Sequence, residues 1–243
     1  MEERLKSRHP KWRFPNMVAI PNAHIINYDI KVYPFREMIS KTVFRVPELR
    51  YLHRYWSRQS KKDTLSYQDN LSLRAAMQNL SQESDFYKIY HPWVANIIGA
   101  KVGRKLSYSL HPKFRVHLSG TQSASGFHRD AHITKRPEQI NVYLPFTDVF
   151  DGNTLWCEDD YGSENFIPLN LTYGQALLWD GGYLKHGTVI NDTGFTRVSC
   201  DFRFHYKDES LADNDIRSVL SGRPADLYAR GLAEVSLLFI RPH

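Results

Sequence analysis

Two histidines and one aspartate lie at spacings that suit a metal site. His128 and Asp130 are separated by one residue, and His186 follows 56 residues after Asp130 (186 − 130). Two imidazoles and a carboxylate can bind one side of a metal ion and leave the opposite positions open, which suits a non-haem Fe(II) that reacts with dioxygen. These three residues are therefore the candidate metal ligands and the candidate catalytic centre.

An arginine follows the second histidine at a useful distance. Arg197 lies eleven residues after His186 (197 − 186). A guanidinium can bind a carboxylate through two parallel hydrogen bonds, so Arg197 could hold the far carboxylate of a 2-oxo acid whose other end binds the metal. The order of ligands and arginine is more informative than His-x-Asp alone, because the chain contains 11 histidines.

The triplet His128-Arg129-Asp130 also opens the catalytic loop of protein kinases. That loop requires an asparagine five residues after the aspartate, and this chain has Lys135 there. The sequence also has no Gly-rich phosphate loop followed by a strand lysine, and no Asp-Phe-Gly. The kinase interpretation is therefore excluded.

With these residues in place, the chain resembles the Fe(II)/2-oxoglutarate-dependent dioxygenases, whose pattern is His-x-Asp, a long gap, His, about ten residues, and Arg. The resemblance covers roughly residues 114–204, under half of the chain. It is greatest to the branch found in antibiotic and other natural-product pathways, including the streptomycin-biosynthesis oxygenase group. The motifs that carry it are Phe127-His128-Arg129-Asp130, Asn141-Val142-Tyr143-Leu144-Pro145 and Arg197-Val198-Ser199-Cys200-Asp201-Phe202-Arg203.

The resemblance implies a function and a set of cofactors. Fe(II) would be bound by the three candidate ligands, 2-oxoglutarate would reach Arg197 with its 5-carboxylate, and dioxygen would take the remaining site. The expected reaction is hydroxylation of a C–H bond in a small molecule, such as a natural product, a sugar or aminocyclitol, or an amino-acid derivative. Related halogenases carry a small residue at the carboxylate position, so Asp130 argues against halogenation.

Polar residues in the strand-like segments add candidates for cosubstrate binding. Polar and apolar residues alternate in these segments, so every second side chain shares a face. An ordinary half-exposed strand would show the same alternation, and only the metal-site interpretation favours an inward direction. The candidates, besides Arg197, are Ser199, Asn141, Tyr143 and Arg115, with His117 as a similar case.

The elements expected to position these residues form a single catalytic domain. The fold class is mainly β with α additions, a double-stranded β-helix (jelly roll, cupin-like) core supported by N-terminal helices. Ser66 and Asp69 resemble a capping box within the helical region. The expected parts are an N-terminal arm with strands over residues 1–45, supporting helices over 46–100, the core with the iron site over 105–205, and a C-terminal segment over 206–243.

Composition limits the partners. The length of 243 residues and the 42% hydrophobic content suit one domain with a substantial core. Although the net charge is +6, the densest basic stretch, residues 50–62, has helical spacing with an apolar face, so no nucleic-acid partner is expected. No apolar run is long enough for a membrane span, and a cytoplasmic protein with a small-molecule substrate is expected. Oligomeric state is not indicated.

Two other classes of function stay open. A cupin-like metal-dependent isomerase or hydrolase could use the same three ligands with Zn²⁺, although such a site would not require Arg197. A non-catalytic binding module on the same scaffold is the other possibility. Dependence of turnover on 2-oxoglutarate separates an oxygenase from the first class, and Fe(II) affinity tests the second.

Overall fold

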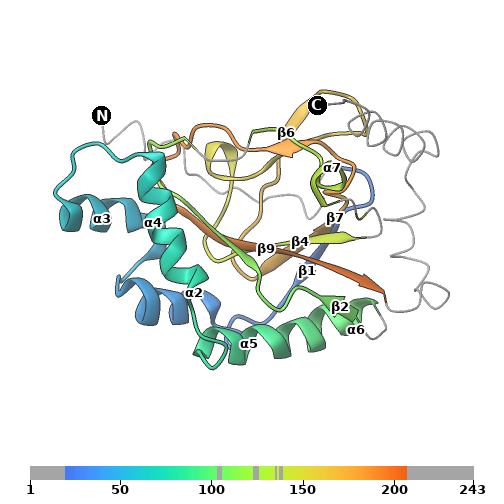
Figure 1. Cartoon of the computed structure of the whole chain (residues 1–243), viewed down its shortest axis with the longest axis horizontal. Helices are drawn as coiled ribbons and strands as arrows, with labels where there is room; N and C mark the ends of the chain where they lie inside the picture. The colour runs from blue at the N-terminus through green and yellow to red at the C-terminus, as the bar shows by residue number, and fades with distance from the viewer. Residues whose placement is uncertain (1–19, 103–105, 123–125, 135, 137–138, 207–243) are drawn as a thin grey trace, which may run out of the picture.

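The computed structural model describes residues 20–102, 106–122, 126–134, 136 and 139–206. Within these ranges two antiparallel sheets form the centre, and helices cover one face of the larger sheet (Figure 1). The prediction of a mainly β fold with helical additions is confirmed, and the finer assignment to a jelly roll stays a prediction. The expected C-terminal segment and the first part of the expected N-terminal arm lie outside the described residues.

The larger sheet contains the long last strand of the described chain, which pairs with three other strands. Its order is β1-β7-β4-β9-β2, and β3 also pairs with β9, with every pairing antiparallel. Strands from near both ends of the described chain therefore lie in the same sheet. The bounds are β1 (His24–Asn27), β2 (Leu106–Tyr108), β3 (Lys113–His117), β4 (Ile140–Pro145), β7 (Gln175–Trp179) and β9 (Arg197–Tyr206).

A smaller sheet packs over the other face of the large one. Its order is β6-β5-β8, with β5 (Trp156–Glu158), β6 (Phe166–Pro168) and β8 (His186–Gly187). Buried side chains from both sheets meet in one apolar cluster, which includes Tyr143 and Trp179 of the large sheet and Cys157 of the small one. We call the face of the large sheet that is turned toward this cluster the inner face.

Helices cover the opposite face, as expected for residues 46–100. They are α2 (Phe35–Met38), η1 (Ile39–Phe44), η2 (Leu49–Tyr51), α3 (Leu52–Ser60), α4 (Tyr67–Gln78), α5 (Asp85–Trp93), η3 (Val94–Ile98) and α6 (Gly99–Val102). Two short elements, α7 (Asp130–Thr134) and η4 (Asp151–Asn153), lie in later loops. None of the helices among the described residues combines the length and apolar character that a membrane crossing needs.

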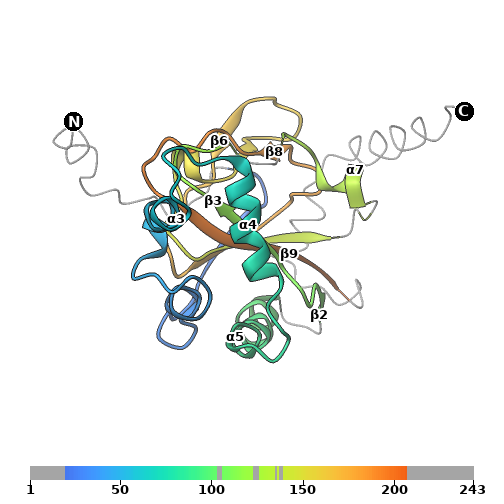
Figure 2. The ribbon, with the colours of Figure 1, turned by 60° about the vertical axis from the view of Figure 1, so that its left-hand side comes forward.

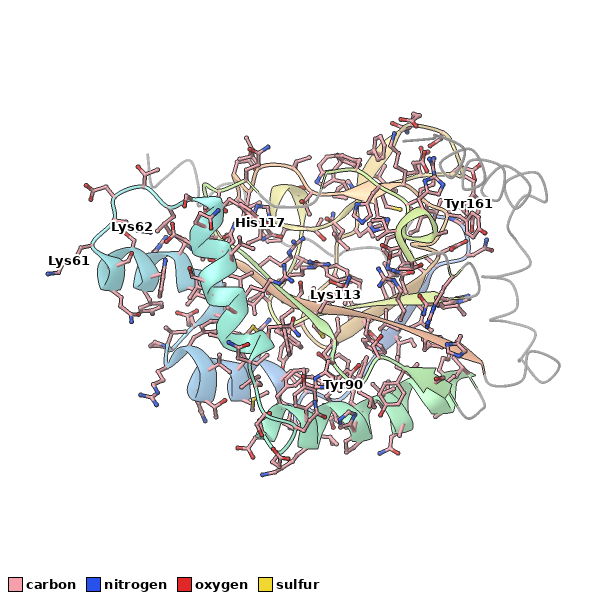
Figure 3. All side chains as sticks on the ribbon, viewed as in Figure 1. Lys61, Lys62, Tyr90, Lys113, His117 and Tyr161 are labelled. Atoms are coloured by element: carbon pink, nitrogen blue, oxygen red, sulfur yellow. The ribbon has the colours of Figure 1, made fainter. Side chains whose placement is uncertain are left out.

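The helices are placed by aromatic packing and by local capping. α4 packs against β3 (Figure 2), and at its start the Asp69 carboxylate accepts the Ser66 backbone N–H at 2.9 Å, as the expected capping box requires. α5 packs on the sheet through rings: Tyr90, labelled in Figure 3, meets Phe202 of β9 with ring centroids 5.4 Å apart. Lys61 and Lys62 lie in the loop after α3 (Figure 3).

One expectation for the N-terminal region was wrong. The sequence predicts an arm with strands over residues 1–45, but residues 35–44 form α2 and a π-helical turn. Phe35 and Ile39 are fully buried there, and Phe35 lies within 6.0 Å of the Trp93 ring. This segment is helical because its apolar side chains are buried against α5. The spacing of the prolines does not predict that contact. The expected strand near residue 25 is present as β1.

Candidate metal centre

The three candidate ligands converge in the structure. One possible ligand atom from each of His128, Asp130 and His186 lies within 4.8 Å of the others. His128 lies in the loop before α7, Asp130 is the first residue of α7, and His186 is the first residue of β8. We refer to residues 126–130 as the first ligand segment and to residues 184–187 as the second.

Backbone hydrogen bonds hold the two ligand segments together. The N–H of His128 donates to the carbonyl of His186 at 2.9 Å, and the N–H of His186 donates back to the carbonyl of His128 at 2.9 Å. This pair forms an antiparallel bridge, which brings the two imidazole centroids to 4.6 Å. Histidines far apart in sequence are thus fixed side by side by the main chain.

Each histidine is oriented by a carbonyl. Nδ1 of His128 lies 2.8 Å from the Gly126 carbonyl oxygen, and Nδ1 of His186 lies 3.0 Å from the Leu184 carbonyl oxygen. A carbonyl only accepts hydrogen bonds, so each Nδ1 carries a proton, and Nε2 is the atom of each ring that can bind a metal. Burial lowers the pKa of His186 to about 4, so this ring is neutral near pH 7. His186 is thus in the neutral form that binds a metal through Nε2, and the His128 ring is oriented in the same way.

Asp130 is buried and held through one oxygen. Its Oδ2 accepts hydrogen bonds from Asn141 Nδ2 at 2.6 Å and from Arg203 Nε at 3.0 Å, with Arg203 Nη2 at 2.5 Å. Its Oδ1 lies 3.5 Å from Nε2 of His128. Burial raises the pKa of Asp130, but the His128 ring and the Arg203 guanidinium outweigh this and hold the pKa well below its usual range. The carboxylate is therefore ionised and has one oxygen free for a metal.

The main chain at Gly181 lies close to both Asn141 and Asp130. A Cβ on Gly181 would come within 2.7 Å of the Asn141 side chain, so a larger residue there would displace the amide that holds Asp130. Gly181 also accepts the backbone N–H of Asp130 at 3.0 Å. The Trp179 ring packs edge-on against His186 with centroids 4.7 Å apart. The ligand geometry thus depends on the segment that follows β7.

Arg197 lies on the inner face with unused hydrogen-bond donors. It is 2% exposed, and its Nε and Nη1 have no hydrogen-bond partner among the described residues. The same holds for the hydroxyls of Ser199 and Tyr143 and for Nδ1 of His117, which lies opposite Arg197 on β3. Burial lowers the pKa of Arg197. Since buried polar groups nearly always have partners, the free donors of Arg197, Ser199 and Tyr143 fit an anionic ligand.

The predicted cosubstrate residues fall into two groups. Ser199 and Tyr143 offer free hydroxyls near Arg197, whereas the Asn141 amide already donates to Asp130. Arg115 is bound to Asp201, with Nε 2.7 Å from Oδ1. The structure thus gives Asn141 and Arg115 protein partners on the same face, and their contact with a cosubstrate stays a prediction.

Sequence reasoning missed Arg203 as a functional residue. Arg203 holds the candidate ligand Asp130, yet the sequence gives no direct signal for that contact. The available signal was the alternation of β9, which places Arg203 on the same face as Arg197. The donor set of two imidazoles and one carboxylate fits a divalent ion such as Fe(II), and the two guanidinium nitrogens of Arg197 that lack a partner among the described residues fit a carboxylate.

Comparison with solved structures finds distant likenesses. No protein-family model matches the chain. Solved structures of the non-heme monooxygenase ThoJ (apo form) and of the alpha-ketoglutarate-dependent epimerase SnoN from nogalamycin biosynthesis are distant likenesses. ThoJ has a TM-score of 0.49 at 11% identity, covering 89% of this chain and 97% of ThoJ. SnoN has a TM-score of 0.46 at 12% identity, covering 84% of this chain and 82% of SnoN.

One relative is similar in sequence. The chain is 30% identical over 167 residues to the streptomycin biosynthesis protein StrG of Streptomyces griseus. The matched region covers 66% of this chain and 79% of StrG. An identity of this size over most of the relative's length reflects common descent. The chain belongs to the StrG family.

Proposed function

We propose that the protein is an Fe(II)- and 2-oxoglutarate-dependent oxygenase that hydroxylates a C–H bond of a small molecule. The observation that carries the proposal is the pairing of two features on one face of the large sheet. Three ligand atoms converge within 4.8 Å, and a buried arginine with free donors lies on the same face. A metal isomerase or hydrolase would need the ligands but would leave that arginine unexplained.

In this proposal His128, Asp130 and His186 hold Fe(II). These side chains are oriented before a metal binds, because the Nδ1 atoms of both rings and one oxygen of Asp130 are already hydrogen-bonded to protein groups. Bound Fe(II) would supply the activation of dioxygen, with 2-oxoglutarate oxidised to succinate and carbon dioxide as one oxygen atom enters the substrate. The protein's own part is to hold these ligands in place.

Arg197 is the proposed partner of the 5-carboxylate of 2-oxoglutarate. Its Nε and Nη1 are buried without a hydrogen-bond partner among the described residues, so a bound carboxylate would restore the hydrogen bonds that burial removed. The Ser199 hydroxyl lies two residues further along the same face of β9 and would add a third donor. Tyr143 on the neighbouring strand β4 is a further candidate.

The proposed substrate is a polar natural-product-like molecule, such as a sugar, an aminocyclitol or an amino-acid derivative. Membership in a family whose relative StrG is described as a streptomycin biosynthesis protein supports this class. The partly exposed Arg115–Asp201 pair on the inner face would offer hydrogen bonds to such a molecule. Hydroxylation is favoured over halogenation because Asp130 fills the carboxylate position.

Succinate formation tests this proposal. Anaerobically purified protein is given Fe(II) and 2-oxoglutarate and then exposed to air. We expect succinate from the wild type, none from His186→Ala, and a raised 2-oxoglutarate requirement in Arg197→Ala. Absence of succinate with folded, iron-loaded wild-type protein and a panel of aminocyclitol and sugar substrates would favour the metal isomerase instead.

A further inference from the structure

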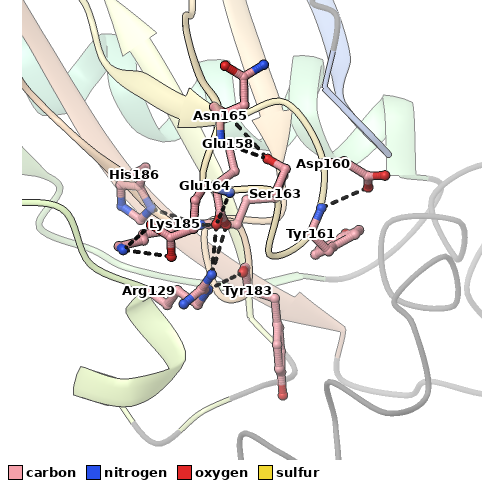
Figure 4. Close-up of polar contacts among 11 residues, drawn as sticks. Arg129, Glu158, Asp160, Tyr161, Ser163, Glu164, Asn165, Tyr183, Lys185 and His186 are labelled. Carbon is pink, nitrogen blue, oxygen red and sulfur yellow. Dashed lines mark hydrogen bonds and ion pairs between the residues drawn. The ribbon is translucent and has the colours of Figure 1, made fainter.

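A buried carboxylate lies between the two ligand segments. Glu158, the last residue of β5, is fully buried. Its two oxygens accept Nη2 of Arg129 at 2.9 and 3.1 Å, and Oε2 also accepts the backbone N–H of Lys185 at 2.7 Å. Arg129 belongs to the first ligand segment and Lys185 to the second, so a single carboxylate binds both (Figure 4).

Further bonds make this contact rigid. Nε of Arg129 donates to the Tyr183 carbonyl at 2.9 Å, so the arginine also binds directly to the chain that leads into the second ligand segment. The N–H of Glu158 donates to the Lys185 carbonyl at 2.9 Å and completes a reciprocal pair with that residue. Arg129 and Glu158 therefore point at each other and at the main chain (Figure 4).

An exposed ion pair at the edge of the same cluster provides a contrast. Nζ of Lys185 lies 2.8 Å from Glu164, whose side chain is 60% exposed. Exposed pairs contribute little, because water and salt screen them. Removing one partner of a buried pair leaves an uncompensated charge and forces its surroundings to move. Glu158 and Glu164 are thus two carboxylates of one cluster with very different expected effects.

We infer that Glu158 is a positioning residue for the metal site, because its carboxylate, together with the backbone bridge between His128 and His186, sets the spacing between the two ligand segments. This inference rests on the proposed metal site. Metal ligands have to be held within about 0.5 Å of their working geometry. In Glu158→Gln, the amide NH₂ would face the Arg129 donors, and the two segments would move apart.

Cobalt(II) binding to the full-length chain tests the inference without turnover. Co(II) alone is titrated into metal-free wild type, Glu158→Gln and the matched control Glu164→Gln, with affinity and the ligand-field absorption spectrum as readouts. Thermal unfolding of the metal-free proteins reports the fold. We expect Glu158→Gln to bind Co(II) about 10- to 100-fold more weakly with a changed spectrum. Glu164→Gln should match the wild type in both.

Different failures have different meanings. If Glu158→Gln binds Co(II) with wild-type affinity and spectrum, the inference is wrong and Glu158 is only structural. If the wild type binds no Co(II), the metal site fails and the inference fails with it. Should Glu158→Gln not fold, Glu158→Asp decides: the charge stays but the reach shortens by one methylene, so the spectrum should still change.

Discussion

The two faces of the large sheet differ sharply, although the same strands make both. On β9 the residues toward the helices are apolar, and those on the inner face are polar; the two sets are Val198, Cys200, Phe202 and Phe204 against Arg197, Ser199, Asp201 and Arg203. The helix side is an aromatic core, whereas the inner face brings together the donors of Arg197, Ser199 and Tyr143, which have no hydrogen-bond partner among the described residues. Successive side chains of β9 point to opposite faces, so the residues that form the apolar core alternate with those that are available to a ligand.

The largest effect should come from removing a metal ligand on the inner face. We expect His186→Ala to weaken Co(II) or Fe(II) binding by well over the roughly 100-fold seen for outer-sphere changes, because one of three ligands is lost. Equilibrium dialysis measures this. Unfolding of the metal-free variant should stay cooperative in urea. Retained tight metal binding would remove His186 from the site.

On the helix side, Trp93→Ala should affect stability and leave the site alone. Trp93 is fully buried and packs against the rings of Tyr28, Phe35 and Phe202. We expect the free energy of unfolding to fall by about 3–5 kcal/mol in urea titrations. Metal affinity of the folded protein should stay within about twofold. A large loss of metal affinity at unchanged stability would show that the two faces are coupled.

Arg203→Gln tests whether an inner-face residue supports a metal ligand that it contacts. Loss of the guanidinium removes the ion pair that holds Asp130, so metal affinity should fall about 10- to 100-fold. Isothermal titration with Co(II) measures the change. Arg50→Gln is the control, since Arg50 forms an exposed pair with Glu48. Equal effects of the two variants would contradict a role for Arg203 at Asp130.

A smaller effect is expected from pH. Burial lowers the pKa of His117 to about 3, so the folded protein keeps this ring neutral while the unfolded chain takes up a proton below about pH 6.5. The unfolded state then binds more protons, and stability falls as pH drops from about 6.5 toward 3. His128 acts in the opposite sense, because the Asp130 carboxylate raises its pKa.

His117→Gln tests this dependence. The variant should lose up to about 1.4 kcal/mol per pH unit of the slope that acidification produces in the metal-free protein. Urea unfolding at several values between about pH 7 and about pH 4 gives the slope. An unchanged slope would mean that His117 already titrates normally in the folded state.

The convergence of the candidate ligands and the two faces of the strands follow from local spacing in the sequence. His-x-Asp, the later histidine and Arg197 were chosen from order alone, and the structure brings the three ligands together. Strand alternation correctly placed Arg197 and Ser199 on one face. The capping residues Ser66 and Asp69 likewise needed only their three-residue spacing.

Contacts between distant segments were not predictable in the same way. Periodicity gives the face of Arg203 and Arg115 but not their partners, which are Asp130 and Asp201. Glu158 carried no signal at all, since its position between the ligand segments arises only when β5 pairs with β8. Partner choice depends on tertiary packing, and a single sequence does not contain that information in a local pattern.

The most direct test of the central claim is an anaerobic titration of the Fe(II)-loaded protein with 2-oxoglutarate, followed by the charge-transfer absorbance of the complex. We expect a saturable band in the wild type, and in Arg197→Lys the half-saturation point should need about 10- to 100-fold more 2-oxoglutarate. No band with folded, iron-loaded wild-type protein would contradict the account, because the metal and the arginine would then not share a ligand.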